Sequence, residues 1–341
     1  MAYFHPTLHP VIQGLLITSA IIIACEAPSV ARTPLPQPPG NTRLGQQKEF
    51  TISSGVQVKG QKYVRQPLIM KGSKTDAVSN LIVDNIEMDH SGPLFAAFMA
   101  GQSLSDARFS RIRSVEAQSG LLRFRGPIHN LLIEDIELHI TAVNQDPKKV
   151  PFGIALAGKT SADTGSEIII RNAIISGAKS AHEGYRNGDG IATERGYSNI
   201  RLENITSSDN SDAGFDLKSS DTIGRNLTAE RNQRNFKLWY GQSFDGPITS
   251  IDPGGVGSAR PAHIALCGKK DGSSVFSFAH INFRATTPVP LIDIGERCGK
   301  VRVIIKSYSL NVPKDTPKLS GAINLASVEW GTEIPVDKGA R

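Results

Sequence analysis

The sequence predicts an all-β protein that folds as a right-handed parallel β-helix, a single-stranded solenoid of stacked coils. Short strands recur along the chain, and the apolar centres of three copies, Ile191, Phe215 and Phe236, lie 24 and 21 residues apart. A repeat period in the twenties is typical of a solenoid, because each unit buries its apolar face only by stacking on the next. No long stretch shows sustained helical periodicity.

A second type of strand alternates with these copies and ends in Asn or Asp followed by an apolar residue. It appears at 81–86, 131–136, 168–173 and 200–205, and in a degenerate form at 223–227. Two alternating strand types with variable loops at the corners describe a parallel β-helix. The recurrent Asn is typical of a turn. We therefore interpret Asn204 and Asn226 as rungs of the helix, although each begins a glycosylation sequon.

Length, composition and charge agree with this fold. A chain of 341 residues is long for one compact domain, but the core of a solenoid grows in one dimension. The 32 glycines and 39% hydrophobic residues suit many short strands with tight turns. The net charge of +6 fits an acidic partner, although an ordinary basic surface explains it equally. Basic runs with interleaved aromatic residues are missing from the sequence, so we expect no nucleic acid partner.

The N-terminal part of the chain is predicted to direct export. The apolar run 11–24 has the length of a signal-peptide core and ends in Ile22-Ile23-Ala24-Cys25, which is similar to a bacterial lipoprotein box. We therefore predict a signal peptide at 1–25 with lipidation of Cys25, a proline-rich tether at 26–47 and a β-helix domain at 48–341. The protein would reside in the periplasm or be anchored to the outer membrane. Secretion after cleavage behind Ala31 is the alternative, because the first ten residues contain no Lys or Arg.

Cys267 and Cys298 lie 31 residues apart, which is close to one coil. In an exported protein, this spacing favours a disulfide between neighbouring coils, and two unpaired thiols are the alternative. Inserts at 143–151, 179–186 and 242–261 are expected to wall a binding groove, because insertions in a solenoid collect on one face.

Alternation along the strands predicts two outward columns of side chains. The first column holds Arg123, Ala155, Ala192, Asp216, Lys237, Ala265 and Asp293. The second holds Arg125, Ala157, Glu194, Lys218, Trp239 and Cys267. Small residues flank a charged centre in these columns. This pattern predicts a shallow trough with the reactive residues in its middle.

Asp189 and Asp212 lie at turns that enter two of these strands, so we expect them to meet Asp216 at one edge. Three carboxylates with few basic competitors suit a hard cation such as Ca²⁺, which takes six to eight oxygen ligands. Each aspartate taken alone also fits a turn or a solvated surface. Lys237 also fits a cross-strand pair with Asp216.

Residues 187–240 resemble the family 9 polysaccharide lyases, which are pectate lyases with a parallel β-helix. That family carries the segments Asn-Ala-Asp-Gly-Phe, Asn-Ser-Asp-Asp-Gly-Trp-Asp-Leu and Asn-Gly-Phe-Lys-Leu. This chain has Asn-Gly-Asp-Gly-Ile from Asn187, Asn-Ser-Asp-Ala-Gly-Phe-Asp-Leu from Asn210, and Arg-Asn-Phe-Lys-Leu from Arg234. The resemblance implies that Asp189, Asp212 and Asp216 bind Ca²⁺ and that Lys237 is the catalytic base. Ala213 stands where the family has a further calcium-binding Asp, and this loss is expected to weaken the metal site.

The implied reaction is β-elimination in an acidic, uronate-containing polysaccharide. A base removes the proton next to the uronate carboxylate, and a cation bound to that carboxylate stabilises the developing charge. A free lysine, with a pKa of about 10.4, needs a lowered pKa for this role. Asp216 must therefore be committed to the metal, because on its own it would raise the lysine pKa. The expected substrate contacts are Lys218, Glu194, Trp239, Arg123, Arg125 and Arg234.

The sequence thus favours a calcium-dependent lyase that acts as a monomer on an acidic polysaccharide. The alternative is a non-catalytic β-helix protein that binds or organises cell-surface polysaccharide, which Ala213 favours. A hydrolase or a uronate epimerase on the same fold is a third interpretation. The Asp-Asp pair and Gly-His-Gly segment of β-helix galacturonidases are missing from the sequence.

Overall fold

A computed structural model of the chain describes residues 50–64, 68–69, 77–89, 94–96, 102–117, 120–146, 148, 150–158, 163–181, 184–255, 257 and 259–336. The predicted signal peptide, Cys25 and tether lie outside the described residues. Among the residues that are described, no helix has the length and apolar character needed to cross a membrane.

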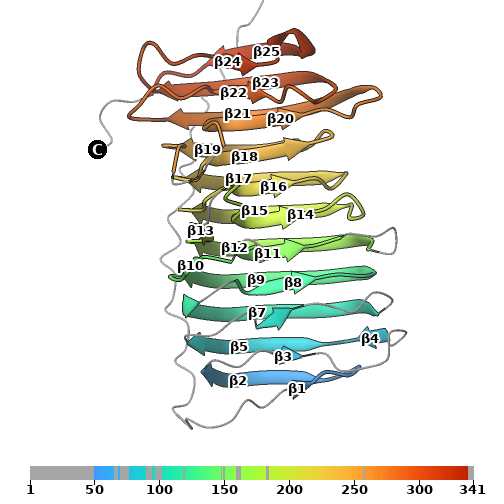
Figure 1. The fold of residues 1–341 in the computed structure, drawn as a ribbon. Helices are drawn as coiled ribbons and strands as arrows, with labels where there is room; N and C mark the ends of the chain where they lie inside the picture. Colours follow the sequence, from blue (N-terminus) through green and yellow to red (C-terminus); the bar gives the residue numbers. More distant parts are fainter. Residues whose placement is uncertain are drawn as a thin grey trace, which may run out of the picture. The chain divides into compact units, whose positions relative to one another are not determined.

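The described residues form a right-handed parallel β-helix, as the sequence predicts (Figure 1). Its strands alternate between an 11-stranded and a 12-stranded parallel sheet. The 11-stranded sheet contains β1 (Phe50–Thr51), β3 (Leu68–Ile69), β6 (Phe95–Ala96), β8 (Leu122–Phe124), β11 (Phe152–Leu156), β14 (Asp189–Thr193), β16 (Ala213–Leu217), β18 (Arg234–Trp239), β20 (Ala262–Cys267), β22 (Ile292–Ile294) and β24 (Leu319–Gly321).

The 12-stranded sheet holds the longer strands, which follow those of the first sheet along the chain. It contains β2 (Gln57–Val64), β4 (Ala77–Ser79), β5 (Ile82–Asp89), β7 (Ser103–Ala117), β9 (Ile128–Ile140), β12 (Gly165–Ser176), β15 (Ile200–Ser208), β17 (Thr222–Glu230), β19 (Ser243–Ile251), β21 (Ser273–Arg284), β23 (Lys300–Asn311) and β25 (Ala326–Glu333). A short 3₁₀ helix, η1 (Ile323–Leu325), precedes β25.

Several long strands are interrupted by one residue in the left-handed conformation. Asn172, Asn204 and Asn226 have φ angles of 53°, 55° and 51°, which Asn tolerates better than most residues do. Their side chains form a ladder, in which Asn204 donates to Asn172 over 3.0 Å and Asn226 donates to Asn204 over 2.8 Å. The interpretation of Asn204 and Asn226 as rungs is therefore confirmed.

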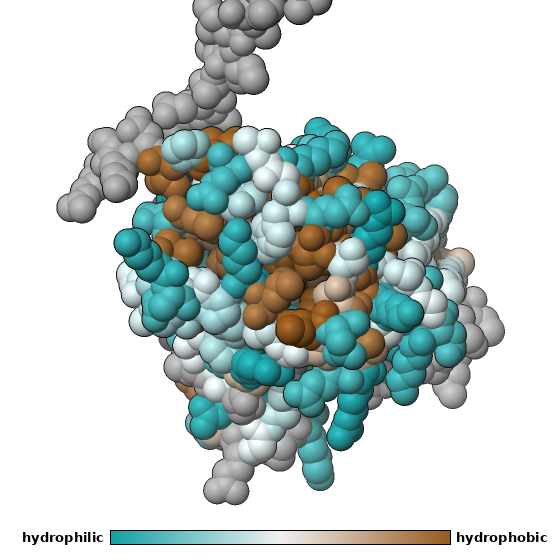
Figure 2. Space-filling model, turned by 90° about the horizontal axis from the view of Figure 1, so that it is seen from above, coloured by the Kyte–Doolittle hydropathy of each residue, from teal (hydrophilic) through white to brown (hydrophobic). Residues whose placement is uncertain are grey.

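The core runs between the two sheets along the whole stack. Ile191, Phe215 and Phe236 are fully buried, and the rings of Phe215 and Phe236 stack with centroids 5.1 Å apart. Burying each such side chain stabilises the fold by roughly 1.5–3 kcal/mol. Figure 2 shows the end of the stack that β24 and β25 form, where apolar side chains gather in the middle and polar ones surround them. Leu325 and Trp330 pack against the core there.

The loops at the corners confirm some sequence predictions and correct one. Cys267 and Cys298 form the predicted disulfide, with Cα atoms 5.0 Å apart. The inserts at 143–151 and 179–186 contribute β10 (Val143–Asn144) and β13 (Lys179–Ser180), which pair in a separate two-stranded sheet. The predicted insert at 242–261 is wrong for its first half. Residues 243–251 form β19 of the 12-stranded sheet, and a register shift beside Pro247 hides its repeat pattern.

Candidate functional site

The 11-stranded sheet sets the predicted outward columns side by side. In the first column, Asp216 pairs with Ala192 on one side and with Lys237 on the other. The same ladder continues to Arg123 through Ala155, and to Asp293 through Ala265. In the second column, Trp239 pairs with Cys267. The predicted register is therefore confirmed.

Three carboxylates converge in the middle of this sheet. Asp189 begins β14, Asp212 directly precedes β16, and Asp216 lies within β16. One oxygen from each lies within 4.8 Å of the others, and the three residues are at most 4% exposed. Gly190 permits the close approach of β14 to the core, because a Cβ atom there would lie 1.9 Å from Ser207 Oγ. The predicted meeting of the three acids at one edge is thus confirmed.

Lys237 lies among these carboxylates and is 9% exposed. Its Nζ atom donates to Asp212 Oδ2 over 2.7 Å and to Asp216 Oδ2 over 3.0 Å. Burial alone would lower the pKa of Lys237, but Asp216, Asp212 and Asp189 outweigh it and raise the pKa well above its usual value. The side chain is therefore a paired ammonium in this structure. The lowered pKa expected of a free base is not found, because Asp216 accepts a hydrogen bond from the amine.

Asp216 and Asp189 differ in their electrostatic surroundings. Burial would raise the pKa of Asp216, but Lys237 and Lys218 oppose it and hold the pKa below its usual value. Lys218 Nζ lies 3.4 Å from Asp216, and Trp239 donates its indole N–H to the same carboxylate over 2.7 Å. Burial and the charges of Asp212 and Asp216 raise the pKa of Asp189 well above its usual value. Asp189 therefore loses its proton less readily than a free aspartate does, and a further positive charge would favour its ionised form.

The donor set of this centre fits a hard cation. Asp212 Oδ1 is buried and has no hydrogen-bond partner within the described part of the chain. Asn187 Oδ1, two residues before Asp189, is also buried without a hydrogen-bond partner among the described residues. Carboxylate and amide oxygens are the ligands that Ca²⁺ prefers. Ala213 contributes no side-chain ligand, and its backbone N–H donates to Asp189 Oδ1 over 3.1 Å.

Tyr185 contacts the centre and was not predicted. Its hydroxyl donates to Asp212 Oδ2 and accepts a hydrogen bond from Lys237 Nζ over 3.0 Å. Burial raises the pKa of this phenol above its usual value, so it stays protonated. The residue belongs to the insert 179–186, which was expected to wall a groove. No periodic signal distinguishes it within that insert, so only its place in an insert beside the site could have indicated it.

The predicted substrate contacts fall into two groups. Lys218, Glu194 and Trp239 lie at the charged centre, where Lys218 Nζ is 2.7 Å from Glu194 Oε1. Arg234 pairs in register with Ala213, and its Nε donates to the Arg260 carbonyl over 3.2 Å. The second group, Arg123 and Arg125, lies farther along the sheet at β8 and makes no contact with the three acids.

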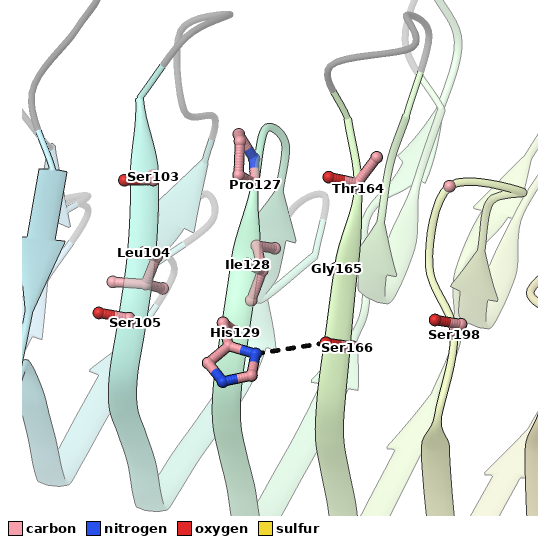
Figure 3. A pocket seen from close by; sticks show the side chains of 11 residues that line it. Ser103, Leu104, Ser105, Pro127, Ile128, His129, Thr164, Gly165, Ser166 and Ser198 are labelled. Carbon is pink, nitrogen blue, oxygen red and sulfur yellow. Dashed lines mark hydrogen bonds between the residues drawn. The ribbon is translucent and has the colours of Figure 1, made fainter.

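A hollow away from the three acids lies at the corner where β7, β9 and β12 begin (Figure 3). It has a volume of about 520 Å³ and is lined mainly by backbone and by small side chains such as Ser105 and Ser198. Its one imidazole, His129, is already hydrogen-bonded to Ser166 at 3.2 Å and lies 3.2 Å from Glu167. None of the predicted site residues lines this hollow, and it offers no uncompensated charge.

The fold and the site together define a class of protein: a right-handed parallel β-helix that carries a buried cluster of acids and one amine on its 11-stranded sheet. No protein-family model matches the sequence, and a search of curated proteins gives no match. The resemblance to the family 9 lyases therefore rests on residues 187–240 alone.

Proposed function

We propose that this protein is a calcium-dependent polysaccharide lyase that cleaves an acidic, uronate-containing polysaccharide by β-elimination. One observation carries the proposal: Asp189, Asp212 and Asp216 meet Lys237 on three adjacent strands. These four residues stand in the order and spacing that the family 9 lyases share. We further propose that the chain is exported and acts as a monomer, either free or attached to the membrane by a lipid on Cys25.

Each residue has a defined part in the proposed reaction. Asp189, Asp212 and Asp216 would hold Ca²⁺, which when bound supplies positive charge to the uronate carboxylate and so acidifies the neighbouring C–H bond. Lys237 takes the proton from that carbon. A carbon–carbon double bond then forms as the C–O bond to the leaving sugar breaks, and the leaving oxygen takes up a proton. Lys237 acts as a base only when Asp212 and Asp216 stop accepting its hydrogen bonds, because these carboxylates raise its pKa.

The residues around Lys237 would position the sugar. The ring of Trp239 lies 5.8 Å from Lys237 Nζ, so a uronate at the amine would also contact this ring. Lys218 balances Asp216 and Glu194 and is close enough to meet the substrate carboxylate. Tyr185, from the insert 179–186, places its ring 5.6 Å from Lys237 Nζ and donates its hydroxyl to Asp212.

A specific observation favours the second candidate, a non-catalytic protein that binds surface polysaccharide. Lys237 forms ion pairs with both Asp212 and Asp216, so its ammonium group supplies positive charge to the two carboxylates without a metal. Ala213 also removes one carboxylate from the set that the resemblance implies. In this alternative the trough binds the polymer, and Lys237 remains an ammonium.

Product absorbance separates the two candidates. The purified β-helix domain is incubated with polyuronates, first with Ca²⁺ and then with a chelator, and the ultraviolet absorbance of the unsaturated product is followed. A lyase gives rising absorbance that the chelator and Lys237→Ala both abolish. The matched control is Lys306→Ala, an exposed lysine of β23 on the other sheet, which should leave the rate unchanged. Retention on polyuronate without absorbance would support the binding protein, and reducing ends without absorbance would indicate a hydrolase.

A further inference from the structure

Two arginines beside β8 share the outward columns of the charged centre. Arg123 stands in the column of Asp216, and Arg125 stands two residues further on. Leu122 and Phe124, which alternate with them, are fully buried in the core. Both arginines therefore face the same side of the 11-stranded sheet as Lys237.

The guanidinium group of Arg123 is held in place but is not fully satisfied. It stacks on the ring of Phe152 at 3.9 Å, and its Nη2 donates to the Val150 carbonyl over 3.1 Å. Its Nε, like that of Arg125, is buried and has no hydrogen-bond partner among the described residues. A buried N–H group without an acceptor is unfavourable, so a ligand that supplies an acceptor there would be stabilised.

Within the described part of the chain, neither guanidinium group has a carboxylate at ion-pair distance. Elsewhere in the described structure, arginines such as Arg231 and Arg302 form ion pairs at 2.9 Å with Asp209 and Glu329. No carboxylate of the described residues forms such a pair with Arg123 or Arg125. Burial and the neighbouring Arg125 lower the pKa of Arg123 to about 10, which still leaves it charged at neutral pH. Two adjacent cations without an ion-pair partner among the described residues attract an anion.

The surface between the arginines and Lys237 is floored by small residues. Ala155 and Ala192 occupy the first column between Arg123 and Asp216. Phe152 is the first residue of β11 and pairs in register with Asp189. Because the Arg123 guanidinium stacks on the Phe152 ring, it lies over β11 rather than over its own strand. From β11 to β18, which carries Lys237, there are three strand steps, or about 14 Å at roughly 4.8 Å each.

We propose that Arg123 and Arg125 form an anion subsite for the polysaccharide, which binds the carboxylate of a sugar about three units from the unit at Lys237. The identity of the ligand rests on the proposed function. A pyranose unit of an extended chain advances by about one strand spacing, so a linear polyuronate in the trough places one carboxylate at each coil. Arginine forks bind carboxylates in a bidentate manner.

Oligomers of different length test this subsite. The affinity of the protein for hexagalacturonate and for trigalacturonate is measured by calorimetry in the presence of a chelator, so that cleavage does not interfere. A trimer with one unit at Lys237 ends short of the arginines, whereas a hexamer reaches them. Arg125→Gln should weaken hexamer binding about tenfold and leave trimer binding unchanged, because it removes a charged hydrogen bond. Arg123→Lys keeps the charge but loses the fork, and should have a smaller effect in the same direction.

The matched control is Arg225→Gln, which removes an equal charge from the other sheet, where Arg225 is paired with Asp245. Equal losses for the trimer and the hexamer, or a similar loss in the control, would overturn the subsite, since the effect would then be general electrostatics. Failure of the wild-type protein to bind hexamers of galacturonate, mannuronate or guluronate would overturn it as well. Lyase activity with length-independent affinity would keep the proposed function and reject the subsite. Length-dependent affinity without unsaturated product would keep the subsite and reject the lyase function.

Discussion

Individual ion pairs offset part of the negative charge at the centre. Lys237 bridges Asp212 and Asp216, while Lys218 bridges Asp216 and Glu194. Removing one partner of a buried ion pair strands the other, which costs about 3–5 kcal/mol. Lys237→Ala is therefore expected to destabilise the fold in addition to removing the proposed base. Thermal unfolding of this variant must accompany its activity measurement, with Lys237→Gln as a second variant that keeps hydrogen-bond donors for the two acids.

His263, which lies outside the candidate site, should make the free energy of unfolding depend on pH. His263 is fully buried, its Nδ1 lies 2.7 Å from Ser250 Oγ, and burial lowers its pKa to about 4. In the unfolded chain the pKa is about 6.5. Between that pH and about 4, the imidazole is therefore protonated in the unfolded state but neutral in the folded state. The free energy of unfolding should therefore fall as the pH drops from about 6.5 to about 4, and this contribution should then level off. The full loss is about 3 kcal/mol.

The measurement is urea unfolding at pH 7 and pH 4.5 for the wild-type protein and for His263→Gln, which does not titrate. The comparison between the two proteins is essential, because Asp189, with its raised pKa, acts in the opposite direction. The variant should lose less stability than the wild-type protein over this interval. Equal losses in the two proteins would show that His263 is not the responsible group.

At the scale of single strands, the asparagine ladder should set the local stability of the 12-stranded sheet. Asn204 has a φ angle of 55° and joins Asn172 and Asn226 through its side chain. Asn204→Ala loses both hydrogen bonds and places a Cβ-bearing residue without a polar group in the left-handed region, at a cost of roughly 1–2 kcal/mol. Asn204→Gly loses the same bonds but avoids the backbone strain, so it should cost less. Chemical denaturation of both variants measures the difference, and equal stabilities would contradict a role for the left-handed backbone.

The strands also show what could be predicted from the sequence and what could not. The meeting of Asp189, Asp212 and Asp216 followed from the repeat, because in-register parallel strands convert spacing in the sequence into neighbourhood in space. For Lys237 the sequence left two states open, a free base and a cross-strand pair with Asp216. The structure has the pair, and the repeat could not decide this because the pKa depends on where a long flexible side chain points. Tyr185 was missed because it belongs to an insert, where no period applies. The interpretation of 242–261 as an insert failed because an irregular register obscured β19.

At the scale of the whole solenoid, the site lies between coils and should couple cation binding to stability. Asp189 belongs to β14, while Asp212 and Asp216 belong to the next coil, and Lys237 to the coil after it. Each coil contacts mainly its neighbours, so a cation that ties these coils together stabilises the middle of the stack. A ligand that binds only the folded state adds about 2.7 kcal/mol at a hundred times its dissociation constant.

Calcium is therefore expected to raise the midpoint of thermal unfolding, and Mg²⁺ to raise it less, because Mg²⁺ demands a regular octahedron and keeps its waters. Asp216→Asn should abolish the calcium effect, whereas Asp245→Asn, an exposed acid on β19, should leave it unchanged. The measurement is a thermal melt over a range of metal concentrations at constant ionic strength. The absence of any shift with calcium would mean that Lys237 and Lys218 stabilise these acids without a metal, and the non-catalytic binding function would then explain the site better than the lyase.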